Sequence, residues 1–293
     1  MKSASIISSP TSDRKNTPDS SESFASGGAG AFRARLNNIQ AIAGLVILEL
    51  CRRKDFYVLF FLTALITLIL GSVNFFNEDK IVRYLKEICL FLIWAFSLVI
   101  AITTTARQIP SERENRTIFP LLAKPVTRDQ LVLGKFWGCW QAAGLALALF
   151  YLFFIILSGV REHQWPLASY LQALGLHWCM LGMVIAMTLL GSMIFSSPSA
   201  NNTIIFVVAA GIFLLGRNLN RFAQNLSEPM YSVTYALYFA IPHLEIFDMR
   251  DLIIHNWDTI PWLVWLGAIV YAAVYMGIFL IAACLVFRRK PLN

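Results

Sequence analysis

Five long stretches of the chain contain no Asp, Glu, Lys or Arg. They cover residues 56–77, 88–106, 136–160, 163–216 and 259–287. A charge at the centre of a bilayer costs about 2.5–3.5 kcal/mol. A helix needs about 20 apolar residues to cross about 30 Å of hydrocarbon. Four of the stretches therefore predict one membrane-spanning helix each.

The stretch 163–216 is too long for a single span, because 54 residues of helix would extend about 80 Å. Its only polar cluster, residues 196–202, predicts a turn there. The chain is thus predicted to be an all-α, polytopic membrane protein with six spans. The segment 203–216 is the shortest, and its length also fits a re-entrant segment. We place the spans at about 56–76, 88–106, 136–160, 170–195, 200–216 and 262–287.

The positions of Lys and Arg predict how the spans are oriented, because basic residues are retained on the cytoplasmic side. Placing the amino terminus inside puts 17 of the 24 basic residues on the cytoplasmic side and 7 outside. Both termini are therefore predicted to be cytoplasmic. The formal net charge of +7 is concentrated beside membrane spans, where it would contact anionic lipid. We expect membrane lipid, and no nucleic acid, as a partner.

Composition supports this class and divides the chain into three parts. Hydrophobic residues make up 57% and charged residues 14%, against about 45–50% and about 25% in a soluble domain. Residues 1–30 are rich in Ser and Gly and predict a disordered cytoplasmic tail. Residues 31–55 predict an amphipathic helix on the inner surface, although the first span starting early is an alternative. Residues 56–290 form the predicted transmembrane domain.

The outer loop 217–258 contains an apolar stretch, Met230 to Ile241, between two prolines. This stretch is too short to cross the membrane, so we expect it to pack against the outer half of the bilayer. Five acidic residues surround it, and they fit either a solvated rim or an entrance for a metal or a cationic substrate. They are Glu228, Glu245, Asp248, Asp251 and Asp258.

The chain lacks the sequence patterns of common catalytic sites. No G-x-x-x-x-G-K-[ST], H-E-x-x-H, C-x-x-C or G-x-S-x-G pattern occurs, so we expect no ATP hydrolysis and no cofactor in this chain. The predicted spans also contain none of the charged residues that ion-coupled pumps use. Soft metal ligands gather only in 170–195, where His177, Met180, Met183 and Met187 could guide Cu(I) or simply pack against a neighbouring helix.

The cytoplasmic loop 107–135 contains features that a simple connection between two spans does not need. Helix-start signals at Ser111 and at Thr127, separated by prolines, predict two short surface helices. Apolar residues between them offer a surface for a partner protein. They are Ile118, Phe119, Leu121 and Leu122.

This loop resembles the one that permease subunits of the ABC-2 family carry between spans two and three, with the pattern E-x-E-x-G-T-x-x-x-L-L-x-x-P-V-x-R-x-x-x-x-x-G-K. The chain departs from the pattern at Arg116, which replaces the glycine, and at Pro120, which interrupts the helix. The matching residues are Glu112, Glu114, Thr117, Leu121, Leu122, Pro125, Val126, Arg128, Gly134 and Lys135.

The resemblance implies a permease subunit of an ABC transporter in a bacterial plasma membrane. A separate ATPase subunit would bind ATP with Mg²⁺ and dock on this loop, and a second permease chain, identical or different, would complete the pathway. Glu112, Glu114 and Arg116 would contact the ATPase, Lys124 to Arg128 would set the second short helix, and Gly134-Lys135 would act as a hinge. The alternative is a non-transport membrane protein, either a scaffold or regulator or an intramembrane enzyme.

Overall fold

A computed structural model describes most of the chain beyond the amino-terminal segment. The described residues are 37–49, 52, 54–72, 78–114, 127–163, 165–195, 197–223 and 230–289. Within these ranges every regular element is a helix. The predicted tail, residues 1–30, lies outside the described residues.

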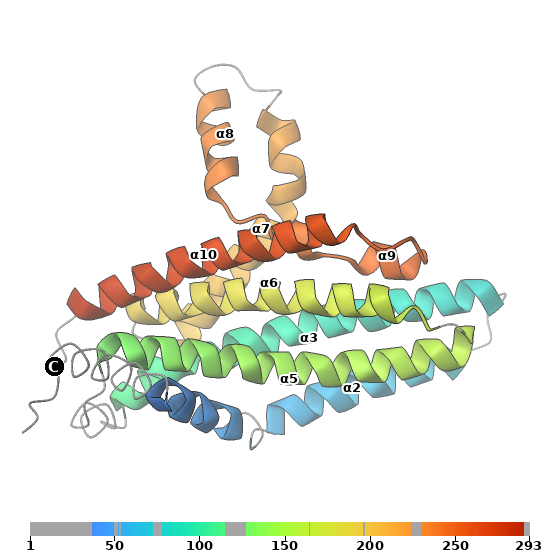
Figure 1. Cartoon of the computed structure of the whole chain (residues 1–293), viewed down its shortest axis with the longest axis horizontal. Helices are drawn as coiled ribbons and strands as arrows, with labels where there is room; N and C mark the ends of the chain where they lie inside the picture. Colours follow the sequence, from blue (N-terminus) through green and yellow to red (C-terminus); the bar gives the residue numbers. More distant parts are fainter. Residues whose placement is uncertain are drawn as a thin grey trace, which may run out of the picture. The chain divides into compact units, whose positions relative to one another are not determined.

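Figure 1 shows the helices in their order along the chain. The first described helix covers residues 37–49. It is followed by α2 (Lys54–Ser72), α3 (Glu78–Glu114), α5 (Arg128–Glu162), α6 (Leu167–Ile194), α7 (Pro198–Ala223), α8 (Met230–Ala240), the 3-10 helix η1 (Leu244–Phe247), α9 (Arg250–Ile254) and α10 (Trp262–Arg289).

Each of the six predicted spans coincides with a helix, but the helices differ in apolar length. Four are long and apolar enough to cross a membrane: Val82–Pro110 within α3, and the whole of α5, α6 and α10. The apolar parts of α2 and α7, Phe56–Ile69 and Pro198–Leu214, are shorter. The described residues therefore establish an all-helical protein with four candidate membrane-spanning helices.

The predicted turn within 163–216 is present. Helix α6 ends at Ile194 and α7 begins at Pro198. The side chain of Asn201, which is fully buried, donates from Nδ2 to the Thr188 carbonyl at 3.1 Å and ties the start of α7 back to α6. The Asn201 amide nitrogen thus finds an acceptor in α6, whereas among the described residues the Asn201 and Asn202 side-chain oxygens are buried without a hydrogen-bond donor.

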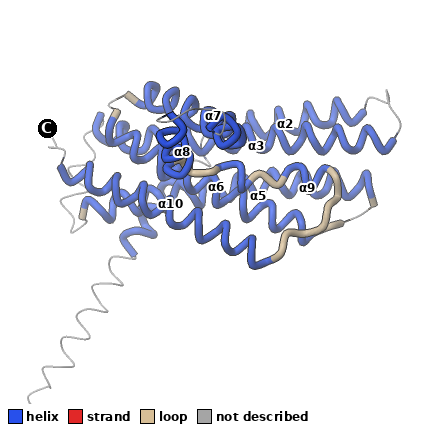
Figure 2. The backbone as a smooth tube through the Cα atoms, turned by 90° about the horizontal axis from the view of Figure 1, so that it is seen from above, coloured by secondary structure: helices blue, strands red, loops and turns tan. Residues whose placement is uncertain are grey.

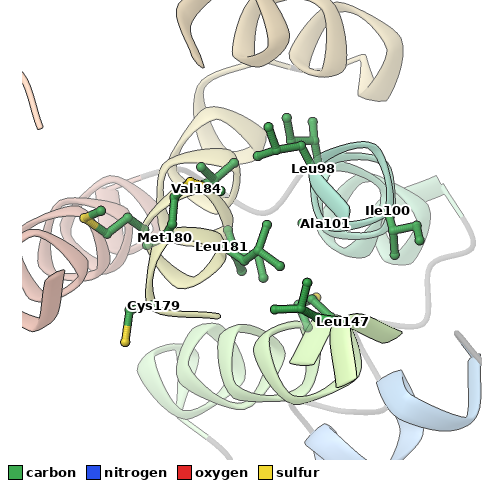
Figure 3. Close-up of a cluster of buried hydrophobic side chains, with 14 of the residues drawn as sticks. Leu98, Ile100, Ala101, Leu147, Cys179, Met180, Leu181 and Val184 are labelled. Carbon is green, nitrogen blue, oxygen red and sulfur yellow. The ribbon is translucent and has the colours of Figure 1, made fainter. Parts of the chain in front are cut away.

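Helix α6 forms the centre of the helical packing, in contact with α3, α5, α7 and α10. The tubes of Figure 2 show α3, α5, α6 and α10 running roughly in the same direction, whereas α7 crosses them. In Figure 3, Leu147 of α5 and Leu181 of α6 point toward each other in the space between α3, α5 and α6. Their side chains belong to one cluster of buried apolar residues that dispersion forces hold at interior density.

A pair of tryptophans fastens α5 to α6. The indoles of Trp140 and Trp178 stack with ring centroids 4.6 Å apart, and each Nε1 donates to the other residue's carbonyl, at 2.9 and 3.0 Å. Glycines make room for this reciprocal contact, because a Cβ on Gly144 or Gly182 would lie within 3.0 Å of an indole nitrogen. Both polar indole groups are thereby satisfied inside an apolar interface.

The apolar stretch predicted between two prolines of the outer loop forms helix α8, which packs beside α7 (Figure 1). The chain then returns through η1 and α9 to the body of the helical packing. Gln172 of α6 holds the segment before α10 by a pair of hydrogen bonds with the Ile260 backbone, at 2.9 and 3.1 Å.

Candidate functional site

The residues predicted to couple to an ATPase lie around the segment 115–126, which is outside the described residues. Helix α3 leads into this segment and α5 leads out of it. Glu112 and Glu114 belong to the last turn of α3, and Arg128, Gly134 and Lys135 belong to α5. The other predicted site residues, Arg116, Thr117, Leu121, Leu122, Lys124 and Pro125, lie outside the described residues.

The prediction of a separate short helix beginning at Ser111 was wrong. Helix α3 continues without a break from Glu78 through Pro110 and Ser111 to Glu114. A proline inside a helix removes one backbone hydrogen bond and normally ends or kinks it. Here Gln108, Ile109 and Pro110 are all buried, so tertiary packing holds the turn that the local signal was expected to break.

The predicted helix start at Thr127 is correct, but the helix that begins there is not a separate short one. The Thr127 side chain accepts from the Gln130 backbone, and the Gln130 side chain accepts from the Thr127 N–H, which completes a capping box. Helix α5 then runs continuously to Glu162. It passes through Gly134 and Lys135 without interruption, so the structure has no break at the predicted hinge.

The first turn of α5 is attached to the last turn of α10. Arg128 donates to the Phe287 carbonyl at 3.1 Å and lies over the Phe287 ring, 5.7 Å from its centroid. Asp129 forms an ion pair with Arg288, whose Nε lies 3.0 Å from the carboxylate. A cation placed on the last carbonyls of a helix satisfies groups that have no partner within the helix.

A chain of three polar side chains links helix 37–49, α3 and α5. The Gln108 amide accepts from Lys135 Nζ at 2.9 Å and donates to the Glu49 carboxylate at 3.0 Å. Gln108 is 2% exposed and Lys135 is 8% exposed. The neutral amide thus connects an ammonium and a carboxylate through charge-assisted hydrogen bonds, which are stronger than neutral ones.

Two glycines of α5 allow helix 37–49 to approach closely. A Cβ on Gly134 would lie 2.9 Å from Ile42 Cβ, and a Cβ on Gly138 would lie 2.8 Å from both Ala43 Cα and Val46 Cβ. Residues four apart lie on the same face of a helix, so the pair forms one flat surface. Ile42, Ala43 and Val46 are buried against it.

Sequence reasoning missed most of these contacts. It did not identify Glu49, Gln108 or Asp129, whose partners lie far away in sequence. The spacing of Gly134 and Gly138 was the one available signal, because two small residues four apart are typical of close helix packing in membranes.

We define the coupling end as helix 37–49, the end of α3, the start of α5 and the end of α10. This arrangement can transmit a displacement at segment 115–126 to several helices together.

The candidate Cu(I) ligands lie elsewhere, in α6. His177, Met180 and Met183 are buried, and Met187 is partly buried against the apolar cluster. Ser97 donates to the Trp94 carbonyl at 3.0 Å and therefore accepts from His177 Nε2 at 2.9 Å. In Figure 3, Met180 points from α6 toward α10. In the described part of the chain no three His, Cys, Asp or Glu side chains gather to hold a metal ion.

Comparison with known proteins agrees with the all-helical architecture. No curated protein matches the sequence. The family model described as ABC-2 family transporter protein matches residues 5–292, nearly the whole chain. The chain therefore belongs to the ABC-2 family of transporter membrane proteins.

Proposed function

We propose that the chain is the permease subunit of an ABC transporter and that a separate ATPase docks on the coupling end, at segment 115–126. One observation carries this proposal: the helices that bracket the segment are fastened to each other and to α10. Lys135 and Gln108 join α5 to α3, and Arg128 joins α5 to α10. These contacts support a segment that receives force rather than one that only connects two spans.

Closure of the ATPase would push on segment 115–126 and, through it, on α3 and α5. Because helices are stiff along their axes and packed interiors deform little, the displacement would pass along the spans as a rigid motion. Arg128 and Asp129 would carry it to α10, and the Glu49 link would carry it to helix 37–49. ATP and Mg²⁺ would be bound by the partner, and this chain would supply the pathway for a substrate whose chemistry the proposal leaves open.

In this proposal the chain crosses a bacterial plasma membrane six times, with both termini in the cytoplasm. Helices α2 and α7 supply two spans in addition to the four longer ones. A second permease chain, identical or different, pairs with it, and α10 exposes a row of apolar side chains that can face lipid or that second chain. The row includes Leu263, Val270, Val274, Ile278 and Ile281.

The test is copurification with an ATPase. The tagged chain is solubilised from its native membranes, copurifying soluble ATPases are identified, and ATP turnover is measured with and without the chain. The double variant Glu112→Ala, Arg116→Ala should insert normally but release the ATPase or lose stimulation of its turnover. Asp258→Ala, an exposed carboxylate outside the coupling end, should behave as wild type.

Two outcomes would contradict the proposal. A wild-type chain that copurifies with no ATPase would refute the function. A double variant that still binds the ATPase and stimulates it normally would refute the docking site, even if the chain is a transporter subunit.

A further inference from the structure

A pocket of about 400 Å³ lies between the start of α3 and α9, away from the coupling end. Tyr84, Glu87 and Phe91 line it from α3, Arg250 and Asp251 line it from α9, and two isoleucines complete its walls. Its volume falls within the range typical of small-molecule sites, roughly 300–1,000 Å³. Nothing in the proposed coupling to an ATPase uses this pocket.

The one cationic residue of the pocket already has its counter-charge. Arg250 donates from Nε and from a terminal nitrogen to the two carboxylate oxygens of Asp248, at 2.8 and 2.7 Å. Its guanidinium also lies over the Trp94 and Phe91 rings, 5.0 and 6.0 Å from their centroids. The hydrogen bonds that Arg250 donates to Asp248 raise the pKa of Arg250 above its ordinary value, so this ion pair persists at physiological pH.

Unlike Arg250, the two acidic side chains of the pocket have no directly contacting counter-charge among the described residues. Among the described residues, the carboxylates of Glu87 and Asp251 have no hydrogen-bond donor and no ion-pair partner within 4 Å. Both residues line the pocket and are exposed. With Arg250 balanced by Asp248, the pocket keeps two negative charges that no cation of the described chain neutralises by direct contact.

Aromatic side chains accompany these charges. Tyr84 and Phe91 are about half exposed, at 53% and 52%, although both line the pocket. An aromatic ring face attracts a cation, most strongly where water is partly excluded. Ca²⁺ and Mg²⁺ instead require about six oxygen ligands, which two carboxylates between isoleucines and aromatic rings do not supply. The chemistry of the walls favours an organic cation over a metal ion.

We propose that this pocket binds a substituted ammonium group, with Glu87 and Asp251 supplying the counter-charge and Tyr84 an aromatic wall. The candidate span Val82–Pro110 begins shortly before Tyr84, so the pocket lies at the end of a membrane-spanning helix. This is the level of lipid headgroups. The ammonium group can therefore come from a soluble amine or from the choline headgroup of a phospholipid.

The experiment uses the full-length chain, purified without any ATPase, and two probes. In detergent, choline chloride is titrated by calorimetry. In nanodiscs, retention of phosphatidylcholine over phosphatidylglycerol is measured by native mass spectrometry. The test variant is the double substitution Glu87→Gln, Asp251→Asn, which keeps shape and removes charge. The matched control is Asp258→Asn, which removes an exposed carboxylate outside the pocket.

Binding of choline that weakens at least tenfold in the double variant, and stays unchanged in the control, supports a soluble amine as the ligand. Choline that does not bind, with phosphatidylcholine retained selectively by the wild type and lost in the double variant, supports a lipid headgroup. The proposal is overturned if neither probe binds, or if the double variant weakens the binding less than tenfold. Because no ATPase is present, these outcomes leave the proposed coupling function untouched.

Discussion

Substituting Gly138 by alanine tests whether close packing holds helix 37–49 on α5. The added Cβ would lie 2.8 Å from Ala43 Cα and 2.8 Å from Val46 Cβ. Carbon atoms pack best at about 3.5–4.0 Å, so the two helices must move apart. Ala43 Cα belongs to the backbone and cannot rotate out of the way as a flexible side chain does.

The size of the effect follows from comparing the docked and undocked states of helix 37–49. Alanine favours the helical state of α5 by about 1 kcal/mol over glycine, but α5 is helical in both states, so this gain cancels. The cost of an extra methyl in a packed interface, about 1–3 kcal/mol, applies only to the docked state. Since about 1.4 kcal/mol corresponds to a tenfold change, docking should weaken about 5- to 150-fold.

Amide hydrogen exchange over residues 38–49 measures this equilibrium. In the Gly138→Ala protein these amides should exchange faster by about the factor of 5 to 150 that the packing cost sets. Gly44→Ala is the matched control, since Gly44 lies in the docked helix itself and a Cβ there meets no atom within 4 Å. It should leave exchange unchanged or slow it, because it favours the helix.

Two results would refute the reasoning. Unchanged exchange in Gly138→Ala would mean that the interface yields without cost. An equal increase in Gly44→Ala and Gly138→Ala would mean that exchange reports a general loss of helicity rather than a clash between the two helices.

The remaining predictions concern the interior and are measured as thermal unfolding of the purified chain. Trp140→Phe removes one of the two indole hydrogen bonds between α5 and α6 and should destabilise by about 1 kcal/mol, whereas Trp257→Phe, at an exposed ring, should have little effect. Lys86→Met leaves Glu162 without the ammonium that contacts it and should destabilise by up to about 3–5 kcal/mol; replacing Glu162 by Met as well should restore part of the loss. Met183→Leu conserves volume and should change stability by less than about 1.5 kcal/mol; impaired Cu(I) binding in this variant would instead favour a metal pathway.

Charge-free stretches identified the helices because the energetic penalty of a buried charge acts on single residues. The same pattern underestimated helix length. Helix α3 starts at Glu78 and ends at Glu114, well beyond the predicted span 88–106, because a helix continues into water as long as its backbone hydrogen bonds are satisfied. Burial of Gln108, Ile109 and Pro110 explains why the local break signal failed.

The coupling end illustrates what a sequence read alone can identify. Thr127 was correctly predicted as a helix start, because its capping partner Gln130 lies three residues away. The Lys135–Gln108 contact joins residues 27 positions apart, and the Arg288–Asp129 contact spans 159, so neither has a local signature.

Gly134 has a local sequence signal, but that signal allows two interpretations. A glycine in a helix lowers its stability, which favours a hinge, but it also removes a side chain, which favours close packing. Its neighbour at the same face, Gly138, distinguishes the two, because a hinge requires one flexible position whereas a packing surface requires several small residues on one face. The structure places Ile42 and Val46 against this surface. The exchange experiment on Gly138 therefore also tests whether Gly134 belongs to a packing surface or acts as a hinge.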